Sequence, residues 1–293
     1  MKKLSIIIPF YNVEEYLEEC YNSVYNAALN YLDDIEIILV DDCGNDNSAN
    51  IAQRIKKQST IIVKNSSNLG LGGARNTGVA NASGEWLMFI DSDDKIKTNA
   101  IELLLKKIAV NKELNVIKYG FIKNYKDKAI AYTYNVKDKD MHKPGMSWAK
   151  IIKRNLFIKF EEHLKYEDTY WKYKFITTNK NHIKLGIINK PLYIYNKTND
   201  NSITSSISYY DLNWIYSKIV IFYKHTNDKN VKQELYEMIC ENTVNYCITN
   251  FDFKMGLKSL IFLIRVNPFS IKKNKLVLDK MLDIKLERKI IEK

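Results

Sequence analysis

The sequence of 293 residues predicts an α/β fold, with a mostly parallel sheet covered by helices on both faces. Three observations predict it. Strand and helix patterns alternate through the first hundred residues, the strand patterns are continuous apolar runs typical of buried strands, and the first helix pattern gathers its apolar residues on one face. Hydrophobic residues make up 46% and charged residues 27% of the chain, which excludes a disordered or collagen-like protein.

The first half of the chain contains four strand patterns and four helix patterns. Pro9 closes the first strand, and the helix after it places Val13, Leu17, Cys20 and Val24 on one face. The strands are expected at residues 4–8, 35–40, 61–63 and 86–90. The helices are expected at residues 13–32, 47–57, 71–82 and 99–110. Repeated strand–helix–strand units of this kind favour parallel strands.

The alternation becomes less regular after residue 110. Two further strands, antiparallel at the sheet edge, are expected at residues 115–123 and 129–136. Helices are expected at residues 146–154 and 166–178, and a short strand at residues 191–195. From Tyr209 the pattern is helical to the end, which predicts a C-terminal helical extension with a domain boundary near residue 205.

The net charge of +11 is unevenly distributed. Residues 1–99 carry 9 Lys and Arg against 14 Asp and Glu, whereas the last forty residues carry 11 against 4. A nucleic-acid-binding protein is expected to be basic on the module that reads the polymer, so the acidic first third argues against nucleic acid as a partner. An acidic site that holds a phosphorylated ligand usually needs a divalent cation. The basic end fits an anionic lipid surface, an anionic acceptor, a partner chain or simply a solvated face.

The four cysteines show no CxxC spacing, so neither a zinc ribbon nor a disulfide scaffold is expected, and a reducing cytoplasm fits best. The apolar run at the start is broken by Pro9 and followed by Asn12 and Glu14, which argues against a signal peptide. No apolar run approaches the ~20 residues that span a bilayer.

Two of the predicted strands end in carboxylates. Asp41 and Asp42 follow the second strand, and Asp91, Asp93 and Asp94 follow the fourth. Ligands of open α/β sheets bind at the carboxyl ends of strands, so both groups are expected to face one crevice. Helix capping would explain one such pair, but two pairs after continuous apolar runs favour a ligand site. An Asp-x-Asp pattern can hold a divalent metal and a ribose while the metal neutralises a diphosphate.

A glycine-rich segment, residues 68–76, lies between the two carboxylate groups. Glycines before a helix let its N-terminal amides approach a phosphate or a ribose. The segment follows the third strand and lacks G-x-G-x-x-G, whereas residues 9–12 after the first strand read Pro-Phe-Tyr-Asn. A Rossmann dehydrogenase carries its fingerprint after the first strand, so this class is disfavoured.

Taken together, these segments resemble the family-2 glycosyltransferases with the GT-A fold, of the type that builds bacterial surface glycans. The resemblance rests on residues 5–12, 40–48, 68–76 and 89–94, in matching order and spacing. Residues 165–171 resemble the family's Glu-Asp acceptor-site motif, and residues 193–204 its late loop over the diphosphate. This loop has Asn196 where relatives often have Arg, so Lys197 is expected to supply the positive charge.

The resemblance implies a binding site for UDP in the first hundred residues. Pro9 and Tyr11 would flank the nucleobase, and the ring of Tyr11 could stack on it. Asp41 would accept a hydrogen bond from the uracil N–H. Asn68 and Arg75 would hold the nucleotide side of the pocket, Arg75 through its charged fork.

The resemblance also implies a metal-dependent transfer chemistry. Asp91 would contact the ribose or the metal, and Asp93 would ligate Mn²⁺ or Mg²⁺. Asp168 would be the general base that removes the proton of the acceptor hydroxyl, with Glu167 as the second candidate and a helix cap as the structural alternative for Asp168. The expected reaction moves a hexose or N-acetylhexosamine from a UDP-sugar to a hydroxyl of a glycan acceptor (lipooligosaccharide, capsule or another surface glycan), with inversion.

Residues 1–205 are expected to form the catalytic domain, with a nucleotide-binding half at 1–100 and an acceptor half at 101–205; residues 206–293 would form a basic helical region. The apolar stripe from Leu257 to Ile264 would pack on the catalytic domain, form a homodimer or lie on a membrane surface. A cytoplasmic protein, peripheral at the inner membrane, is the expected location, with a free or lipid-linked glycan as acceptor.

Two other functions stay open at the level of sequence. A non-catalytic protein that binds sugar nucleotides or glycans could use the same fold, although the set of Asp91, Asp93 and Asp168 argues against it. A nucleotidyltransferase would usually carry a basic, glycine-rich loop after the first strand, where this chain has residues 9–12.

Overall fold

The computed structural model describes residues 2–135, 145–165, 167–198, 226 and 232. The chain divides into two compact units, Met1–Ile215 and Tyr216–Lys293. All helices and strands given below belong to the first unit. The predicted boundary near residue 205 stays a prediction, and the helices predicted from residue 209 onward lie outside the described residues.

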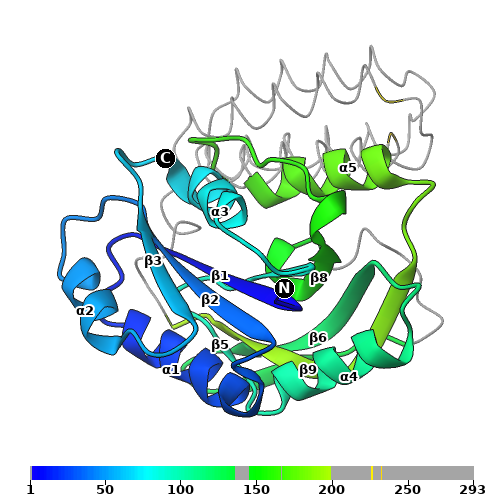
Figure 1. The fold of residues 1–293 in the computed structure, drawn as a ribbon, viewed down its shortest axis with the longest axis horizontal. Helices are drawn as coiled ribbons and strands as arrows, with labels where there is room; N and C mark the ends of the chain where they lie inside the picture. The colour runs from blue at the N-terminus through cyan, green and yellow to red at the C-terminus, as the bar shows by residue number, and fades with distance from the viewer. Residues whose placement is uncertain (1, 136–144, 166, 199–225, 227–231, 233–293) are drawn as a thin grey trace, which may run out of the picture. The chain divides into compact units, whose positions relative to one another are not determined.

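The first half of the sheet is parallel. Its strands are β1 (Leu4–Phe10), β2 (Ile35–Asp41), β3 (Thr60–Lys64) and β4 (Trp86–Phe89). They lie in the order β3-β2-β1-β4, so the chain adds two strands on one side of β1 and then crosses to the other (Figure 1). This reversal of strand order beside β1 is the place where open α/β sheets bind ligands.

The second half continues the same sheet with mixed pairing. It consists of β8 (Lys150–Lys153), β6 (Val116–Asn124), β9 (Leu185–Asn196), β5 (Lys95–Ile96) and β7 (Ala129–Tyr132). Strand β8 is antiparallel to both β4 and β6, while β6 and β9 are parallel, with register shifts on either side of Gly120. Strand β7 pairs antiparallel with β6, as predicted.

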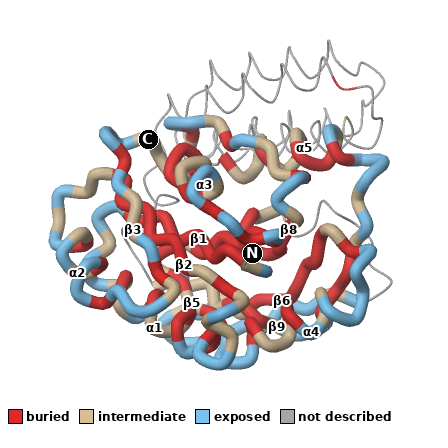
Figure 2. The backbone as a smooth tube through the Cα atoms, in the orientation of Figure 1, coloured by how far each residue is buried: buried red, intermediate tan, exposed pale blue. Residues whose placement is uncertain are grey.

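Helices cover both faces of the sheet, as the sequence predicts (Figure 1). Helices α1 (Leu17–Ala28), α2 (Ser48–Ile55) and α4 (Ala100–Val110) lie on one face, and α3 (Gly70–Ala80) and α5 (Glu167–Asn179) on the other. Side chains of β1 alternate between the two faces: Ile6 and Ile8 join one core and Ile7 the other. The central strands are therefore buried on both sides (Figure 2).

The predicted helix at residues 146–154 is wrong. Short 3₁₀ turns at Ser147–Ala149 and Arg154–Leu156 flank strand β8 instead. Ile151 and Ile152 are both buried but belong to the cores on opposite faces, which is the two-residue period of a strand. Lys150, Ile151 and Ile152 are all buried, so this four-residue strand carries no alternation of buried and exposed residues that could reveal it. The short strand expected at 191–195 is also longer, because β9 begins at Leu185.

Gly78 lets helix α3 lie directly on the sheet. A side chain there would overlap Ile7 of β1 and meet Val40 of β2. We expect Gly78→Val to lower the free energy of unfolding by about 1–3 kcal/mol through overpacking. The matched change Ala80→Val, at an exposed position of the same helix, should cost no more than about 0.7 kcal/mol. Urea unfolding of both variants measures this, and equal losses would contradict the close approach of α3.

Candidate active site

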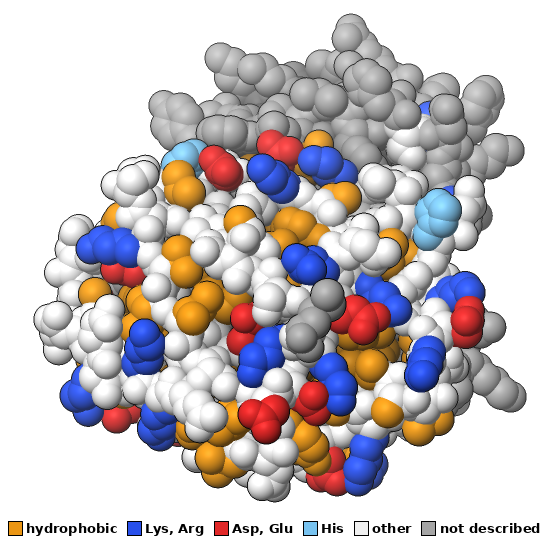
Figure 3. Space-filling view, viewed as in Figure 1, with side chains coloured by type: hydrophobic (Ala, Val, Ile, Leu, Met, Phe, Trp, Pro, Cys, Tyr) orange, Lys and Arg blue, Asp and Glu red, His pale blue; other side chains and the backbone are white. Residues whose placement is uncertain are grey.

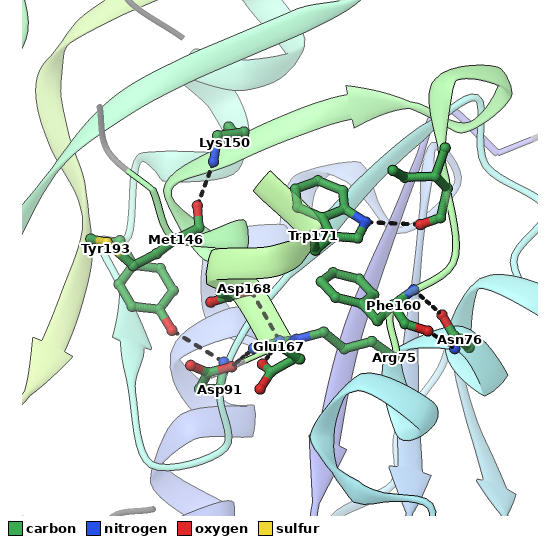
Figure 4. A network of polar contacts seen from close by, with 11 residues as sticks. Arg75, Asn76, Asp91, Met146, Lys150, Phe160, Glu167, Asp168, Trp171 and Tyr193 are labelled. Atoms are coloured by element: carbon green, nitrogen blue, oxygen red, sulfur yellow. Dashed lines mark hydrogen bonds and ion pairs between the residues drawn. The ribbon is translucent and has the colours of Figure 1, made fainter. Parts of the chain in front are cut away.

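A single arginine gathers three carboxylates at the carboxyl edge of the sheet. Arg75 of α3 is fully buried, and its guanidinium donates to Asp91 Oδ1 at 2.6 Å, to Asp168 Oδ1 at 3.2 Å and to Glu167 Oε1 (Figure 4). Asp91 follows β4, whereas Glu167 and Asp168 open helix α5. The two nitrogens Nη1 and Nη2 thus hold the start of α5 beside the end of β4. A third donor, Nε, is buried without an acceptor among the described residues.

The segment before α5 is fastened to helix α3, which explains how distant residues reach Arg75. The Asn76 side chain donates to the Phe160 carbonyl at 3.0 Å and accepts from the Phe160 N–H at 2.9 Å. A side chain on Gly72 would clash with the carbonyl of Glu161, so glycine allows this approach. The ring of Phe160 stacks on Trp171 of α5 and lies 5.3 Å from the Arg75 guanidinium carbon.

One guanidinium faces three carboxylates, so the cluster has an excess of negative charge. Burial raises the pKa of Glu167 to about 7 and that of Asp91 to about 6, although the charge of Arg75 pulls both down. Burial opposes the charged form of Arg75, but the Asp168, Asp91 and Glu167 carboxylates more than compensate and raise its pKa. Arg75 therefore stays charged, and the cluster can exchange a proton near neutral pH.

The remaining acidic residue of the loop after β4 has a structural role. Asp94 is fully buried and accepts from the Tyr193 hydroxyl at 2.6 Å and from the Asn196 N–H at 2.7 Å. The same Tyr193 hydroxyl accepts from the Asp91 N–H at 3.1 Å. Burial and the neighbouring Asp93 raise the pKa of Asp94. These bonds fix the loop that carries Asp91 and Asp93 to strand β9.

The residues predicted to hold the base of a nucleotide lie together at the ends of β1 and β2. Pro9 is buried within β1, and Tyr11 just beyond it is 43% exposed. Asp41 lies opposite Phe10, and its Oδ1 accepts from the Cys43 N–H at 3.0 Å while Lys64 Nζ is 3.6 Å from its Oδ2. The neighbouring strand ends thus carry an exposed ring after β1 and a buried carboxylate at the end of β2.

Of the other two residues predicted to hold the nucleotide, Asn68 lies in the turn before α3 and Arg75 lies within the helix. Asn68 Oδ1 accepts from the Gly70 N–H at 2.8 Å, so this side chain organises the turn into the helix. The polar contacts of Arg75 are with the carboxylates of Asp91, Glu167 and Asp168. Direct contact of either residue with a nucleotide stays a prediction, as do the roles of Pro9, Tyr11 and Asp41.

The structure also qualifies the predicted metal site. Among the described residues, no three His, Cys, Asp or Glu side chains are grouped as a closed metal cluster. Asp93 is partly exposed at the loop after β4, next to Asp91, so the chain offers one or two carboxylate oxygens in an accessible place. Mg²⁺-type cations commonly bind in this way, with substrate phosphates and waters completing the shell. The residues present therefore fit a cation that arrives with a phosphorylated substrate.

Sequence reasoning missed the way Glu167 and Arg75 pair across 92 positions, since no local pattern connects them. It also missed two buried lysines, Lys118 and Lys150, of which Lys150 is close enough to Asp168 for the two charges to interact. A lysine inside the apolar run at residues 115–123 was the available signal for Lys118. Lys150 lay in the segment mistaken for a helix.

The sheet order, with an acidic loop after β4 and helices on both faces, is that of a GT-A fold. Residues 5–167 match the family model described as Glycosyl transferase family 2, which covers more than half of the chain. The chain therefore belongs to glycosyl transferase family 2 and is a glycosyltransferase enzyme. The expected family and fold are confirmed. Membership of this enzyme family disfavours the alternative of a non-catalytic binding protein.

Two bacterial relatives have extended similarity. The uncharacterized glycosyltransferase EpsJ of Bacillus subtilis is 29% identical over 275 residues, covering 84% of this chain and 77% of that protein. The minor teichoic acid biosynthesis protein GgaB of Bacillus subtilis is 26% identical over 247 residues, covering 79% of this chain but 27% of its own length. The first of these relatives is named as a glycosyltransferase and the second as a protein of minor teichoic acid biosynthesis.

Solved structures confirm the fold. The crystal structure of S. aureus TarS in complex with UDP-GlcNAc has a TM-score of 0.74 and 20% identity, covering 96% of this chain and 89% of that chain. A mannosyltransferase from Pyrobaculum calidifontis, in complex with GDP-Man and Mn²⁺, has a TM-score of 0.56 and 13% identity. The match covers 94% of this chain and 74% of that chain. In the described ranges, no helix is long and apolar enough to cross a membrane.

Removing the arginine tests its role in holding the cluster. Arg75→Met leaves three carboxylates without their shared cation, so the ionised forms of Asp91 and Glu167 are disfavoured further in the folded state and the pKa values of these two groups rise. A raised carboxyl pKa costs stability as pH increases, so the loss should be small near pH 5 and reach about 3–5 kcal/mol near pH 8. Urea unfolding at both pH values measures it.

The control for this experiment is Arg54→Met, which removes an exposed ion pair with Glu18. Its loss should stay within about 1 kcal/mol at either pH. A deficit of Arg75→Met that does not change with pH would contradict the charge-based role of Arg75.

Proposed function

We propose that the enzyme transfers a hexose or N-acetylhexosamine from a UDP-sugar to a hydroxyl group of a surface-glycan acceptor, with inversion at the anomeric carbon. One observation carries the proposal. A single guanidinium binds the carboxylate after β4, on the donor side, and Asp168, the general base that we propose. The two groups needed for donor binding and for acceptor activation are thereby held in one rigid arrangement, as efficient transfer requires.

The donor would lie across the ends of β1, β2 and β4. Tyr11 would stack on the uracil with Pro9 on the other side, and Asp41 would accept the hydrogen bond of the ring N–H. Asn68 would contact the nucleotide at the start of α3, Arg75 would lie behind the ribose and phosphates, and Asp91 would contact the ribose or the metal. The complex of TarS with UDP-GlcNAc supports a UDP-sugar as donor.

Asp93, with Asp91 beside it, would hold a Mn²⁺ or Mg²⁺ ion together with the phosphates of the donor. When bound, this cation would offset the charge that develops on the leaving diphosphate. The Mn²⁺ in the complex of the related fold from Pyrobaculum calidifontis supports a divalent cation. The accessible carboxylates after β4 suit such a cation, whereas a closed protein cage is not needed.

Asp168 would accept the proton of the acceptor hydroxyl as its oxygen bonds to the anomeric carbon. The bond from this carbon to the phosphate oxygen breaks in the same displacement, and UDP leaves on the opposite side of the sugar. The products are the glycosylated acceptor, UDP and one proton. Glu167, which bonds to the same Nη1 as Asp168, would keep Arg75 in place rather than act as the base.

The relation to GgaB supports a cell-surface polymer as the acceptor class. Contact of the C-terminal region with the inner membrane, dimerisation through it and a cytoplasmic location remain predictions, since residues 233–293 are outside the described part of the chain.

Release of UDP from UDP-glucose, UDP-galactose and their N-acetyl forms tests the reaction class. With Mn²⁺ we expect slow hydrolysis of one donor, which EDTA removes. Asp93→Ala should abolish the metal-dependent rate, and Asp168→Asn should lower the rate about 10²-fold or more, because water also needs a base. Asp127→Asn, at an exposed turn, is the matched control and should leave the rate unchanged.

Binding of UDP is measured in parallel by its shift of the melting temperature. Absence of both hydrolysis and a UDP-dependent shift would contradict the proposed donor. Full activity in Asp168→Asn would contradict the assignment of Asp168 as the general base. It would leave the proposed donor unaffected.

A further inference from the structure

The loop after β4 is a tight turn whose side chains alternate in exposure. The Asp94 N–H donates to the Asp91 carbonyl at 3.0 Å, which closes residues 91–94 into a turn. Asp91 and Asp93 are partly exposed, whereas Ser92 and Asp94 are buried. We call residues 91–94 the acidic turn. It keeps two carboxylates accessible while its other two side chains lie inside the fold.

One tyrosine hydroxyl attaches the acidic turn to strand β9. The Tyr193 hydroxyl accepts from the Asp91 N–H at 3.1 Å (Figure 4) and donates to Asp94 Oδ2 at 2.6 Å. The other oxygen of Asp94 accepts from the Asn196 N–H of the same strand at 2.7 Å. Acidic side chains at the surface are interspersed with lysines and arginines (Figure 3), whereas Asp94 is fully buried and these two donors are uncharged. The first and last residues of the turn are thus held by the same hydroxyl.

The position of this hydroxyl is set by the core. Tyr193 is fully buried, and its ring stacks on Trp148 with the ring centres 4.3 Å apart and an angle of 11° between the planes. Trp148 is 3% exposed, and its carbonyl accepts from the Tyr119 hydroxyl at 2.6 Å. A ring packed in this way cannot follow a movement of the acidic turn. The turn is therefore fitted to the tyrosine.

The hydroxyl matters most for Asp93. Arg75 holds the side chain of Asp91, but Asp93 lies further along the turn, between the two residues that Tyr193 holds. Without the hydroxyl, the Asp91 N–H would lose its acceptor and Asp94 would lose a donor. Groups that orient the ligands of a metal commonly change its affinity 10- to 100-fold when they are removed.

The nucleobase side of the site does not share this support. Strand β9 lies beside β6 and β5, whereas Pro9, Tyr11 and Asp41 lie at the ends of β1 and β2. A change at Tyr193 should therefore leave the contacts proposed for the uracil in place.

We propose that Tyr193 is a positioning residue for the divalent cation. Its hydroxyl holds the acidic turn so that the carboxylates of Asp91 and Asp93 can bind the cation together with the phosphates of the donor. The proposal rests on the proposed function, in which these two carboxylates bind the cation. The hydroxyl then contributes to the part of UDP binding that needs the metal and not to the part that does not.

Calorimetry of UDP binding to the full-length protein, with Mn²⁺ and with EDTA, separates these two parts. The ratio of the two affinities is the metal enhancement, and by linkage it equals the factor by which UDP strengthens Mn²⁺ binding. Tyr193→Phe removes the hydroxyl and keeps the ring on Trp148. We expect the metal enhancement to fall about tenfold in this variant, while the affinity for UDP in EDTA stays within about twofold.

The matched control is Tyr119→Phe. Tyr119 is also fully buried, and its hydroxyl bonds to the same Trp148, but to the carbonyl of that residue and not to the acidic turn. The two variants thus lose the same chemical group from one aromatic cluster, and Tyr119→Phe should keep the metal enhancement. An unchanged enhancement in Tyr193→Phe would overturn the proposal, and so would equal losses in both variants, since these would reflect a general loosening of the core.

Asp94→Asn tests the same attachment from the other side and keeps the proposal testable if Tyr193→Phe does not fold. An amide has one oxygen, so it cannot accept both hydrogen bonds that Asp94 accepts, and the metal enhancement should again fall. A full enhancement in Asp94→Asn would overturn the proposal. Because the two side chains share one hydrogen bond, the double variant should lose less than the product of the two single losses.

The wild-type protein separates this inference from the proposed function. If Mn²⁺ strengthens UDP binding in the wild type but equally in Tyr193→Phe, only the role of Tyr193 is contradicted. If Mn²⁺ does not strengthen UDP binding in the wild type, the metal role of the acidic turn is contradicted, and the role of Tyr193 with it.

Discussion

The structure of the site depends on one buried cation, the guanidinium of Arg75. A buried arginine is tolerated only when its charge is paired, and here two segments supply the three pairing carboxylates: the loop after β4 supplies one and the start of α5 supplies two consecutive ones. The constraint is reciprocal. If α5 moved away from β4, the guanidinium would lose two of its three ion pairs. The ion cluster therefore couples the parallel half of the sheet to the segment that carries Asp168.

The same cluster gives the site an excess of negative charge and carboxyl groups whose pKa values lie near neutral pH. Three carboxylates share one cation, and burial raises the pKa of Glu167 to about 7 and that of Asp91 to about 6. A site with spare negative charge attracts a divalent cation and its phosphorylated ligand, which an evenly neutralised site would not do. The apolar contacts around it, such as Phe160 against Trp171, keep water from weakening the ion pairs.

The parallel half of the fold was predictable because its strands are continuous apolar runs and its helices follow in regular alternation. The strand ends could be read in the same way, since Asp41 and Asp91 come directly after buried runs. Two things could not be read. Strand β8 has only four residues, of which the first three are buried on both faces, and its sequence was mistaken for part of a helix. The partners of Arg75 lie 92 and 93 positions away, and only the folded chain brings them together.

Strand β4 divides the site into two flanks that differ in chemistry. On one flank, the ends of β1 and β2 offer an exposed ring and a carboxylate, groups that suit a nucleobase. On the other, β8 and β6 place two buried lysines, Lys150 and Lys118, directly opposite each other, and the charge of Asp168 acts on Lys150. Because β1 and β8 pair with opposite edges of β4, we expect substitutions in β6 and β8 to leave the flank proposed for the nucleotide in place. A fold divided in this way can serve many acceptors while its donor side stays the same.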